Sequence, residues 1–315
     1  MLCLAVNPTM DRQVFTSSLV PGSVSRSQRD TVVAGGKPIN AARAALAVDG
    51  RVRLVALLPA EGSDVFSAEL LAEGLACESL TFPGAIRQTI VLFEDSGRTT
   101  VINSPGAAVP PDVWRRYCDL AARSAKPGEC VVVSGSFPPG VGQDQVDHLV
   151  TAVRGAGSRL AVDTGPAWLG WLVASRPDLV APNLAEATAC LTEGPAIESV
   201  EVADDALPRA VWAADRLVQA GARQAVVTAG AVGLAWATPN DSGQMASLAL
   251  PVASPIGAGD ALLGGLVAQL EAGVDFAQAI RWGVACAASA IGQWVPGRVD
   301  PEGARRWYEA LAASD

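Results

Sequence analysis

A turn near residue 257 carries residue types that bind and transfer phosphate. It reads Gly-Ala-Gly-Asp over Gly257–Asp260 and leads into the apolar run Leu262–Leu270. Glycines let the backbone approach a ligand closely, and a helix that begins here would present free N–H groups and its positive dipole end to an anion. Asp260 falls in the first turn of that helix, where a carboxylate either caps the helix or acts as a base toward a hydroxyl. These residues alone leave both roles open.

A second turn, near residue 36, combines paired glycines with a lysine and an asparagine. Gly36 and Lys37 are followed by Asn40 at the start of an expected helix. A cation and an amide donor this close together could bind a phosphorylated polyol, although an ordinary turn with an exposed lysine would look the same. Leu262 prevents the Gly257–Asp260 turn from matching the dinucleotide pattern GxGxxG, and the chain contains no GxxxxGK[ST] loop.

The elements that must position these turns alternate along the chain. Short β-branched runs, expected as strands, lie near 2–6, 52–58, 130–134, 159–163, 179–181 and 225–229. Ala- and Leu-rich stretches, expected as helices, lie near 39–49, 64–74, 143–155, 207–220 and 259–271. This alternation predicts an α/β fold, a three-layer α/β/α sandwich around a mostly parallel sheet. The continuously apolar run Cys130–Val133 is typical of a strand buried on both faces.

Two segments interrupt the alternation. Val14–Val33 and Ile86–Asn103 resemble strands separated by turn residues, and they are too short for crossover units. We expect a small β-sheet, formed by residues about 12–34 and 86–104, to be inserted into a single domain that spans residues 1–315. Its position indicates a lid, and its exposed edges indicate the contact of a homodimer.

Composition excludes several classes of protein. Half of the 315 residues are hydrophobic and 17% are charged, which is enough for a large core without disulfides. The net charge of −9, without a basic run, argues against nucleic-acid binding, so an anion site must use a few placed cations and amides. Six cysteines without CxxC spacing and one histidine, His148, which we expect at the surface, argue against zinc. We expect no targeting or membrane segment and a cytoplasmic location.

Three motifs, in this order and spacing, resemble the ribokinase-like sugar kinases, the PfkB family. They are the Gly-Gly-Lys of residues 35–37 with Asn40, the Pro-Asn of residues 182–183 with Glu186, and the Gly257–Asp260 turn. The segments Asn7–Asp11 and Ser134–Gly140 are similar to motifs of the branch that holds 1-phosphofructokinase, tagatose-6-phosphate kinase and the minor 6-phosphofructokinase. The resemblance implies a ribokinase-like fold and ATP-dependent phosphorylation of a ketohexose phosphate, first of all fructose 1-phosphate to fructose 1,6-bisphosphate.

The resemblance also implies roles at the reacting centre. Asp260 would be the base, and the amides of Gly257, Ala258 and Gly259 would stabilise the transferring phosphoryl group. The residues implied around the sugar phosphate are Asp11, Gly36, Lys37, Asn40 and Arg87. Arg26 is a reserve cation for the substrate's own phosphate, and Arg43 either contributes there or is solvated.

For ATP, the resemblance implies a strand and glycine turn that contain Thr228, Gly230 and Gly233. Asn183 and Glu186 would hold Mg²⁺ and its water shell, which needs few protein ligands. Three positions depart from the family pattern: Pro38 replaces a glycine and removes an N–H, Ala181 replaces a lysine, and the segment 254–256, Ser-Pro-Ile, replaces the commoner lead into the Gly257–Asp260 turn. The open alternatives are tagatose 6-phosphate or fructose 6-phosphate as acceptor, a kinase of an unphosphorylated sugar or nucleoside, and a non-catalytic sugar-phosphate binder.

Overall fold

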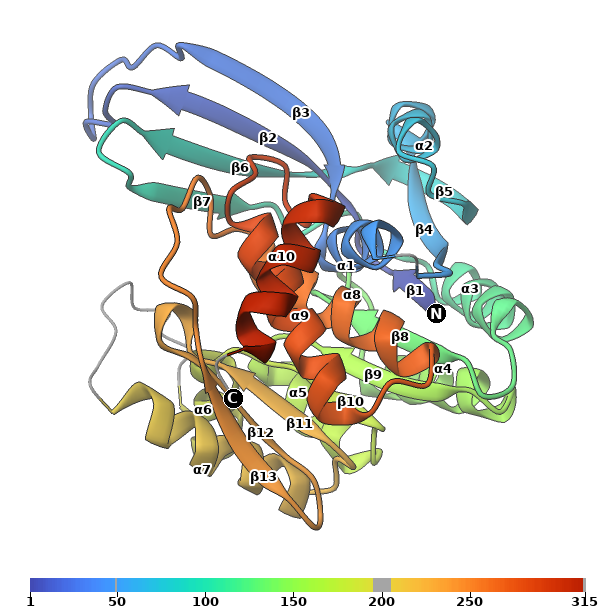
Figure 1. Ribbon diagram of the computed structural model, residues 1–315. Coiled ribbons are helices and arrows are strands. Elements are labelled where there is room, and N and C mark those ends of the chain that lie inside the picture. The colour runs from blue at the N-terminus through green and yellow to red at the C-terminus, as the bar shows by residue number, and fades with distance from the viewer. Residues whose placement is uncertain (49, 195–204, 314–315) are drawn as a thin grey trace.

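A mostly parallel sheet runs through the centre of the molecule (Figure 1). The computed structural model describes residues 1–48, 50–194 and 205–313. Within these ranges, the nine strands of this sheet lie in the order β13 (Ser242–Ala246), β12 (Gly233–Ala237), β11 (Ala225–Thr228), β10 (Leu179–Val180), β9 (Arg159–Asp163), β8 (Cys130–Ser134), β1 (Leu2–Ala5), β4 (Arg53–Glu61) and β5 (Cys77–Ala85). The neighbours β11–β12 and β12–β13 pair antiparallel, and the other neighbours pair parallel.

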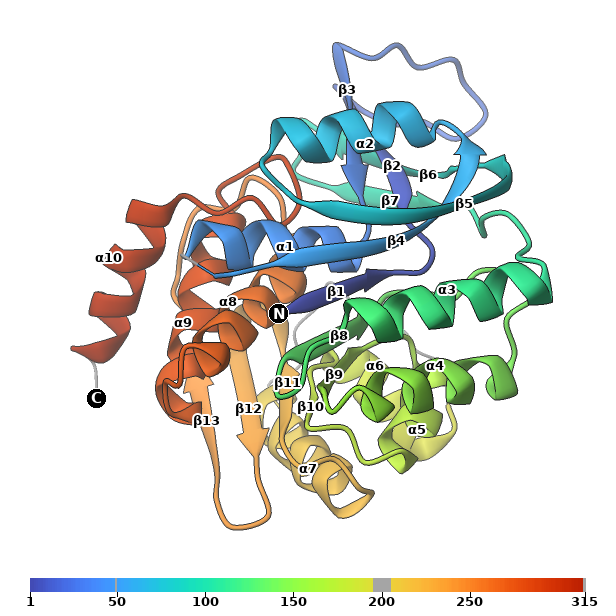
Figure 2. The same cartoon turned by 90° about the vertical axis from the view of Figure 1, so that its right-hand side faces the viewer.

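Helices cover both faces of this sheet, as Figures 1 and 2 show. One face carries α1 (Lys37–Ala47), α2 (Ser63–Ala72), α8 (Ala258–Glu271), α9 (Phe276–Ala290) and α10 (Pro301–Ala312). The other face carries α3 (Pro111–Ser124), α4 (Gln143–Gly155), α5 (Pro166–Ala174), α6 (Leu184–Thr192) and α7 (Ala206–Gln219). The predicted three-layer α/β/α fold is therefore confirmed.

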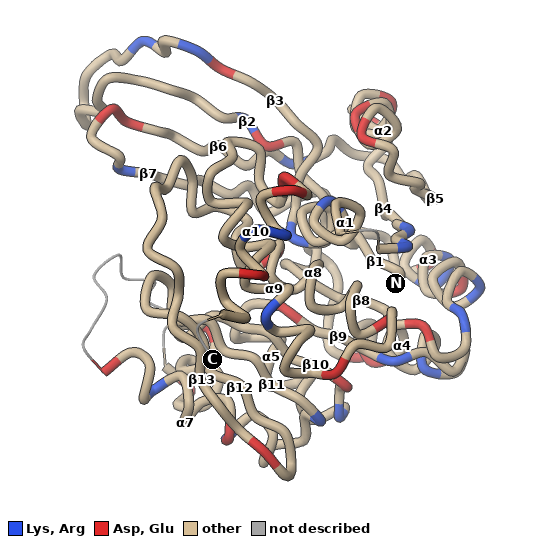
Figure 3. Tube along the Cα trace, viewed as in Figure 1, with Lys and Arg blue, Asp and Glu red and all other residues tan. Residues whose placement is uncertain are grey.

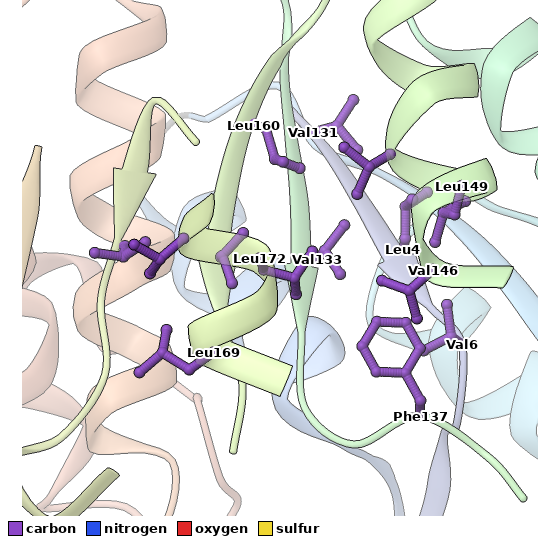
Figure 4. Packing of buried hydrophobic residues seen from close by; sticks show 14 of the residues in the cluster. Leu4, Val6, Val131, Val133, Phe137, Val146, Leu149, Leu160, Leu169 and Leu172 are labelled. Atoms are coloured by element: carbon purple, nitrogen blue, oxygen red, sulfur yellow. The ribbon is translucent and has the colours of Figure 1, made fainter. Parts of the chain in front are cut away.

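The central strands are apolar on both sides because each side meets a helical layer. In β8, Val131 and Val133 point toward the α3–α7 layer, while Val132 belongs to the core beneath α1 and α8. Figure 4 shows the first of these cores, where Val133 lies near Leu172. The continuous apolar run at 130–133 was thus a correct indication of a buried strand.

The small sheet consists of two hairpins. Its strands lie in the order β3 (Arg29–Gly35), β2 (Thr9–Thr16), β6 (Arg87–Glu94) and β7 (Thr99–Asn103), with β2 and β6 parallel to each other. It projects from one end of the body (Figure 1), where Trp294 packs edge-on against Phe15 and Phe93. The first hairpin begins at Thr9 rather than near residue 12, because the strand starts directly after the Asn7-Pro8 turn. Asp11 therefore lies on this sheet.

Other expectations from the sequence can be compared with the helices. The predicted helix 143–155 coincides with α4, where His148 is exposed as expected. The apolar run from Leu262 lies in α8, which is buried over residues 260–268. The predicted helix 39–49 corresponds to α1, and its last residue, Asp49, lies outside the described residues. No described helix has the length and apolar character needed to span a bilayer.

Candidate active site

The predicted site residues gather at the carboxyl ends of the parallel strands, where open α/β sheets bind ligands. Lys37 begins α1 beside this edge, and Asp163 is the last residue of β9. Asn183 follows β10 and pairs with Thr228 in an isolated bridge. The turn at Gly257–Asp260 enters the same region, because Asp260 receives a hydrogen bond from α1.

The backbone conformation of the turn at residue 257 requires a glycine. Gly257 has φ +82°, and a Cβ added there would lie 2.7 Å from the backbone nitrogen of Gly297. Gly259 is exposed, and a Cβ added there would meet no atom within 4 Å. The Ala258 N–H reaches the Pro255 carbonyl at 3.3 Å, a long contact within the turn. Open space therefore lies over Gly259, at the beginning of α8.

Asp260 is buried, and its carboxylate accepts a hydrogen bond from Asn40 Nδ2 at 2.8 Å. A capping aspartate would instead bind first-turn N–H groups. Burial raises the pKa of Asp260 to about 7, because the Lys37 charge and the Asn40 hydrogen bond only partly oppose burial and the nearby Asp163 and Glu186 carboxylates. A carboxyl group with a pKa near 7 suits proton abstraction at neutral pH.

Lys37 lies between two carboxylates. Its Nζ is 2.8 Å from Asp163 Oδ1 and 3.2 Å from Glu186 Oε1. Burial disfavours the charged amine, but these two carboxylates outweigh it and hold the pKa of Lys37 above its usual value. Lys37, which is predicted to bind the sugar, thus contacts Glu186, which is predicted to bind the metal. Pro38 occupies the first turn of α1 without interrupting it, as expected of a proline at a helix start.

Asp163 was not singled out from the sequence. It is buried, and it supplies the shorter of the two ion pairs to Lys37. The available signal was its place as the last residue of the predicted strand 159–163, directly before Thr164 and Gly165. Polar residues that follow buried parallel strands lie at the ligand-binding edge of such sheets.

Asp11 is a buried carboxylate with an unpartnered oxygen. A Cβ added at Gly35 would lie 2.1 Å from Asp11 Oδ2, so any larger residue there would displace this carboxylate. Asp11 Oδ1 is buried and has no hydrogen-bond partner in the protein. Burial raises the pKa of Asp11 to about 6, against the opposing charges of Arg43 and Arg87. Such an oxygen can accept a hydrogen bond from a bound hydroxyl.

The three arginines considered as partners of the substrate's phosphate lie in different environments. Arg87 begins β6, opposite Thr9, and donates from Nε to the Asn7 carbonyl at 2.9 Å. Burial lowers the pKa of Arg87, and Asp11 opposes that shift. Arg26 lies in the exposed connection between β2 and β3. Arg43 is only 6% exposed, so the expectation that it could be solvated was wrong. Figure 3 shows charges of both signs spread along the trace.

Asn183 and Glu186 form a reciprocal cap at the start of α6. Asn183 Oδ1 accepts from the Glu186 N–H at 2.8 Å, and Glu186 Oε2 accepts from the Asn183 N–H at 3.0 Å. Burial raises the pKa of Glu186, and Lys37 opposes it. The described residues contain no group of three or more His, Cys, Asp or Glu side chains suited to a metal ion. These oxygen donors fit only an ion that keeps water and phosphate ligands, as Mg²⁺ does.

The predicted nucleotide residues lie around the turn from β11 to β12. Thr228 ends β11, and Gly230, with φ +58°, has open space where a Cβ would be. Gly233 has φ +128°, and a Cβ added there would lie 2.0 Å from the Met245 carbonyl oxygen. Sheet packing therefore requires glycine at 233, whereas Gly230 leaves room for a ligand.

The fold and the site together fit a sugar kinase. The site holds the buried carboxylate of Asp260 at a glycine turn, and Asp11 lies on a strand near Arg87. The chain belongs to the PfkB family of carbohydrate kinases, whose pattern matches residues 3–296. It is therefore an enzyme that transfers a phosphoryl group from ATP to a sugar.

Two relatives that match most of the chain are both named as phosphofructokinases. The chain is 33% identical to the 1-phosphofructokinase of Rhodobacter capsulatus over 305 residues, 95% of this chain and 92% of that protein. It is 28% identical to the ATP-dependent 6-phosphofructokinase isozyme 2 of Escherichia coli over 295 residues, 91% of each chain.

Solved structures confirm the fold. The phosphofructokinase-2 of Escherichia coli in complex with fructose-6-phosphate superposes with a TM-score of 0.87 at 23% identity, covering 99% of both chains. The ribokinase of Thermotoga maritima superposes with a TM-score of 0.75 at 14% identity, covering 98% of this chain and 99% of the other. The resemblance to ribokinase-like kinases is therefore confirmed for the fold.

Proposed function

We propose that the enzyme phosphorylates a ketohexose phosphate, with fructose 1-phosphate as its first substrate and fructose 1,6-bisphosphate as its product. The observation that carries this proposal is Asp260, a buried carboxylate with a pKa of about 7 at a glycine turn. The name of the Rhodobacter capsulatus relative favours fructose 1-phosphate over fructose 6-phosphate and tagatose 6-phosphate.

In the proposed reaction, Asp260 Oδ1 takes the proton of the sugar 6-hydroxyl, because Oδ2 is held by Asn40. The freed oxygen bonds to the γ-phosphorus of ATP as the bond between that phosphorus and ADP breaks. The amides of Gly257, Ala258 and Gly259 stabilise the charge on the transferring group. Asp11, Gly36, Lys37 and Asn40 orient the sugar, and Thr228, Gly230 and Gly233 follow the nucleotide.

The proposed Mg²⁺ ion belongs near Glu186 and Asn183, with most of its ligands supplied by water and phosphate. When bound, the ion would neutralise phosphate charge. In this structure the Lys37 ammonium pairs with Glu186 and Asp163, so it competes with the ion for these carboxylates. We propose that Lys37 moves part of its contact from these carboxylates to the phosphates when they bind.

Arg87 is the proposed partner of the phosphate that the acceptor already carries. It lies on β6 beside the strand that carries Asp11, and its charge acts on that carboxylate. An acceptor without a phosphate, such as free fructose or ribose, has no need of this cation.

The test is an ADP-release assay with MgATP against fructose 1-phosphate, fructose 6-phosphate, tagatose 6-phosphate, free fructose and ribose. We expect the highest kcat/KM for fructose 1-phosphate and a loss of at least tenfold in Arg87→Ala, with turnover of free fructose unaffected. Equal losses for all acceptors, or none, would refute the role of Arg87. Thermal stabilisation by sugar phosphates without ADP release would instead favour a non-catalytic binder.

We also propose that the small sheet is a lid and the contact of a homodimer in the cytoplasm. Its strands β3 and β7 expose the apolar side chains Val32, Val101 and Ile102, and the six cysteines are free. Exposed apolar side chains on sheet strands favour association. Light scattering of Ile102→Lys should give the monomer mass, and an unchanged dimer mass would exclude this surface.

A further inference from the structure

A series of hydrogen bonds, buried at Arg43, Asn40 and Asp260, leads from the end of α2 to the proposed base. Arg43 Nε donates to Glu73 Oε2 at 2.6 Å, and Arg43 Nη1 donates to Asn40 Oδ1 at 3.1 Å. Asn40 Nδ2 in turn donates to Asp260 Oδ2 at 2.8 Å. Arg43 and Asn40 lie three residues apart on α1, so that they share one face of the helix.

This series determines how the Asn40 amide is oriented. Only the amide oxygen can accept from a guanidinium, and only the amide nitrogen can donate to a carboxylate. Arg43 therefore holds Asn40 with its N–H groups toward Asp260. Without the guanidinium, the amide could rotate and bring its oxygen against the carboxylate. With it, Asp260 Oδ2 is occupied and Oδ1 is left for the substrate.

Arg43 also joins the backbone segments that surround the site. Its Nη2 donates to the Ala34 carbonyl at 2.6 Å, one residue before the Gly35 that packs on Asp11. Its Nη1 reaches the Pro296 carbonyl at 3.3 Å, in the loop that follows α9. That loop packs tightly on Asn40 and on Gly257 of the catalytic turn.

The tightness of this packing is visible at two glycines. A Cβ added at Gly297 would lie 2.4 Å from the Asn40 Cα atom, and one added at Gly257 would lie 2.9 Å from the Pro296 Cβ atom. Arg43 thus fixes the loop on which the catalytic turn rests, as well as the amide that faces the base.

We infer that Arg43 is a positioning residue for phosphoryl transfer, which acts on Asp260 through the Asn40 amide and is itself held by Glu73. This inference rests on the proposed role of Asp260 as the base. It assigns to Arg43 neither contact with the substrate's phosphate nor exposure to solvent, the two roles that the sequence left open.

The test is a double-mutant cycle between Arg43→Lys and Asn40→Ala, with kcat and the KM for ATP measured separately. Lysine keeps a charge but cannot bond to Glu73, Asn40 and the two carbonyls at once. We expect Arg43→Lys to lower kcat about tenfold and to leave the KM for ATP within about twofold, because a base held loosely is seldom aligned. In the Asn40→Ala background, Arg43→Lys should lower kcat by less than about twofold.

Arg53→Lys is the matched control. Arg53 is also paired with a carboxylate, Glu129, but it begins β4 at the opposite end of the strands. We expect its kcat to equal that of the parent. Glu73→Gln is the milder second variant, which weakens the hold on Arg43 and should lower kcat in the same sense with the fold retained, as thermal melting can verify.

An unchanged kcat in both Arg43→Lys and Glu73→Gln, or an equal loss from Arg43→Lys with and without Asn40, would overturn the inference. The proposed function fails separately, if the parent releases no ADP with any sugar or if Asp260→Asn retains activity. A parent that is active and depends on Asp260, but not on Arg43, would refute the positioning role alone.

Discussion

Asp260→Asn should make the protein more stable while it abolishes catalysis. The substituted side chain has the same shape, and its oxygen can still accept the hydrogen bond from Asn40. What disappears is a negative charge that burial disfavours and that lies near the Asp163 and Glu186 carboxylates. Lys37 remains neutralised by those two partners.

The magnitude follows from the pKa of the carboxyl group. A pKa raised from 3.8 to about 7 corresponds to about 4 kcal/mol of lost stability once the group is ionised. Because the folded-state pKa is the higher one, the penalty is absent below about pH 4, grows as the pH rises, and is complete above about pH 7. At pH 8, Asp260→Asn should therefore melt roughly 5 °C above the parent or more, and this gain should shrink toward pH 5.

The assay combines thermal melting at pH 5 and pH 8 with ADP release at saturating substrates. We expect kcat to fall by about 10²–10⁴ when the base is removed. Asp178→Asn is the control, since Asp178 accepts a hydrogen bond from the Leu160 N–H away from the site. A kcat within tenfold of the parent refutes the base, and a lower melting temperature at pH 8 refutes the burial argument.

Three further predictions concern the same site. Burial raises the pKa of Asp260 to about 7 and that of Asp11 to about 6, so kcat/KM should rise with pH and level off above about pH 7.5. A flat pH profile between pH 5 and pH 8 would contradict the role of these carboxylates. Gly259→Ala should keep the parent's melting temperature and lose at least tenfold in kcat, whereas Gly257→Ala, with φ +82° and no space, should lower the melting temperature. Lys37→Met should cost about 2 kcal/mol of stability at pH 8 and less at pH 5, because burial already raises the pKa of Glu186 and the loss of Lys37 raises it further, so that this carboxyl binds a proton. An equal loss at both pH values would contradict this reasoning.

The fold could be predicted from the sequence where a buried strand is a continuous run of apolar residues. The run at 130–133 is apolar on both faces because two layers cover it. The strands β12 and β13, which contain several glycines and alanines, carry little β-propensity and exist through pairing, β12 with β11 and β13 with β12. β5 is an edge strand that contains Pro83 and Gly84, and it resembles a loop in sequence.

The site could be predicted as a set of motifs but not as a set of contacts. Asp260 and Asn40 each stood out by type and local spacing, yet nothing local indicates a hydrogen bond across 220 residues. The burial of Arg43 depends on a loop 253 residues away, at Pro296. Asp163 lay in a position that the sheet topology marks, but its pairing with Lys37 needed the assembled strands.

The hydrogen bond between Asn40 and Asp260 has a consequence for synthesis of the chain. At about 5–20 residues per second, the ribosome needs roughly 10–40 s to add the 220 residues that separate them. During that interval α1 is made but its neighbour α8, whose Gly264 packs on the Ala41 carbonyl, is not. The apolar face of α1 stays uncovered until α8 has been made. The nascent chain is therefore a candidate for chaperone binding until the residues of the catalytic turn have emerged.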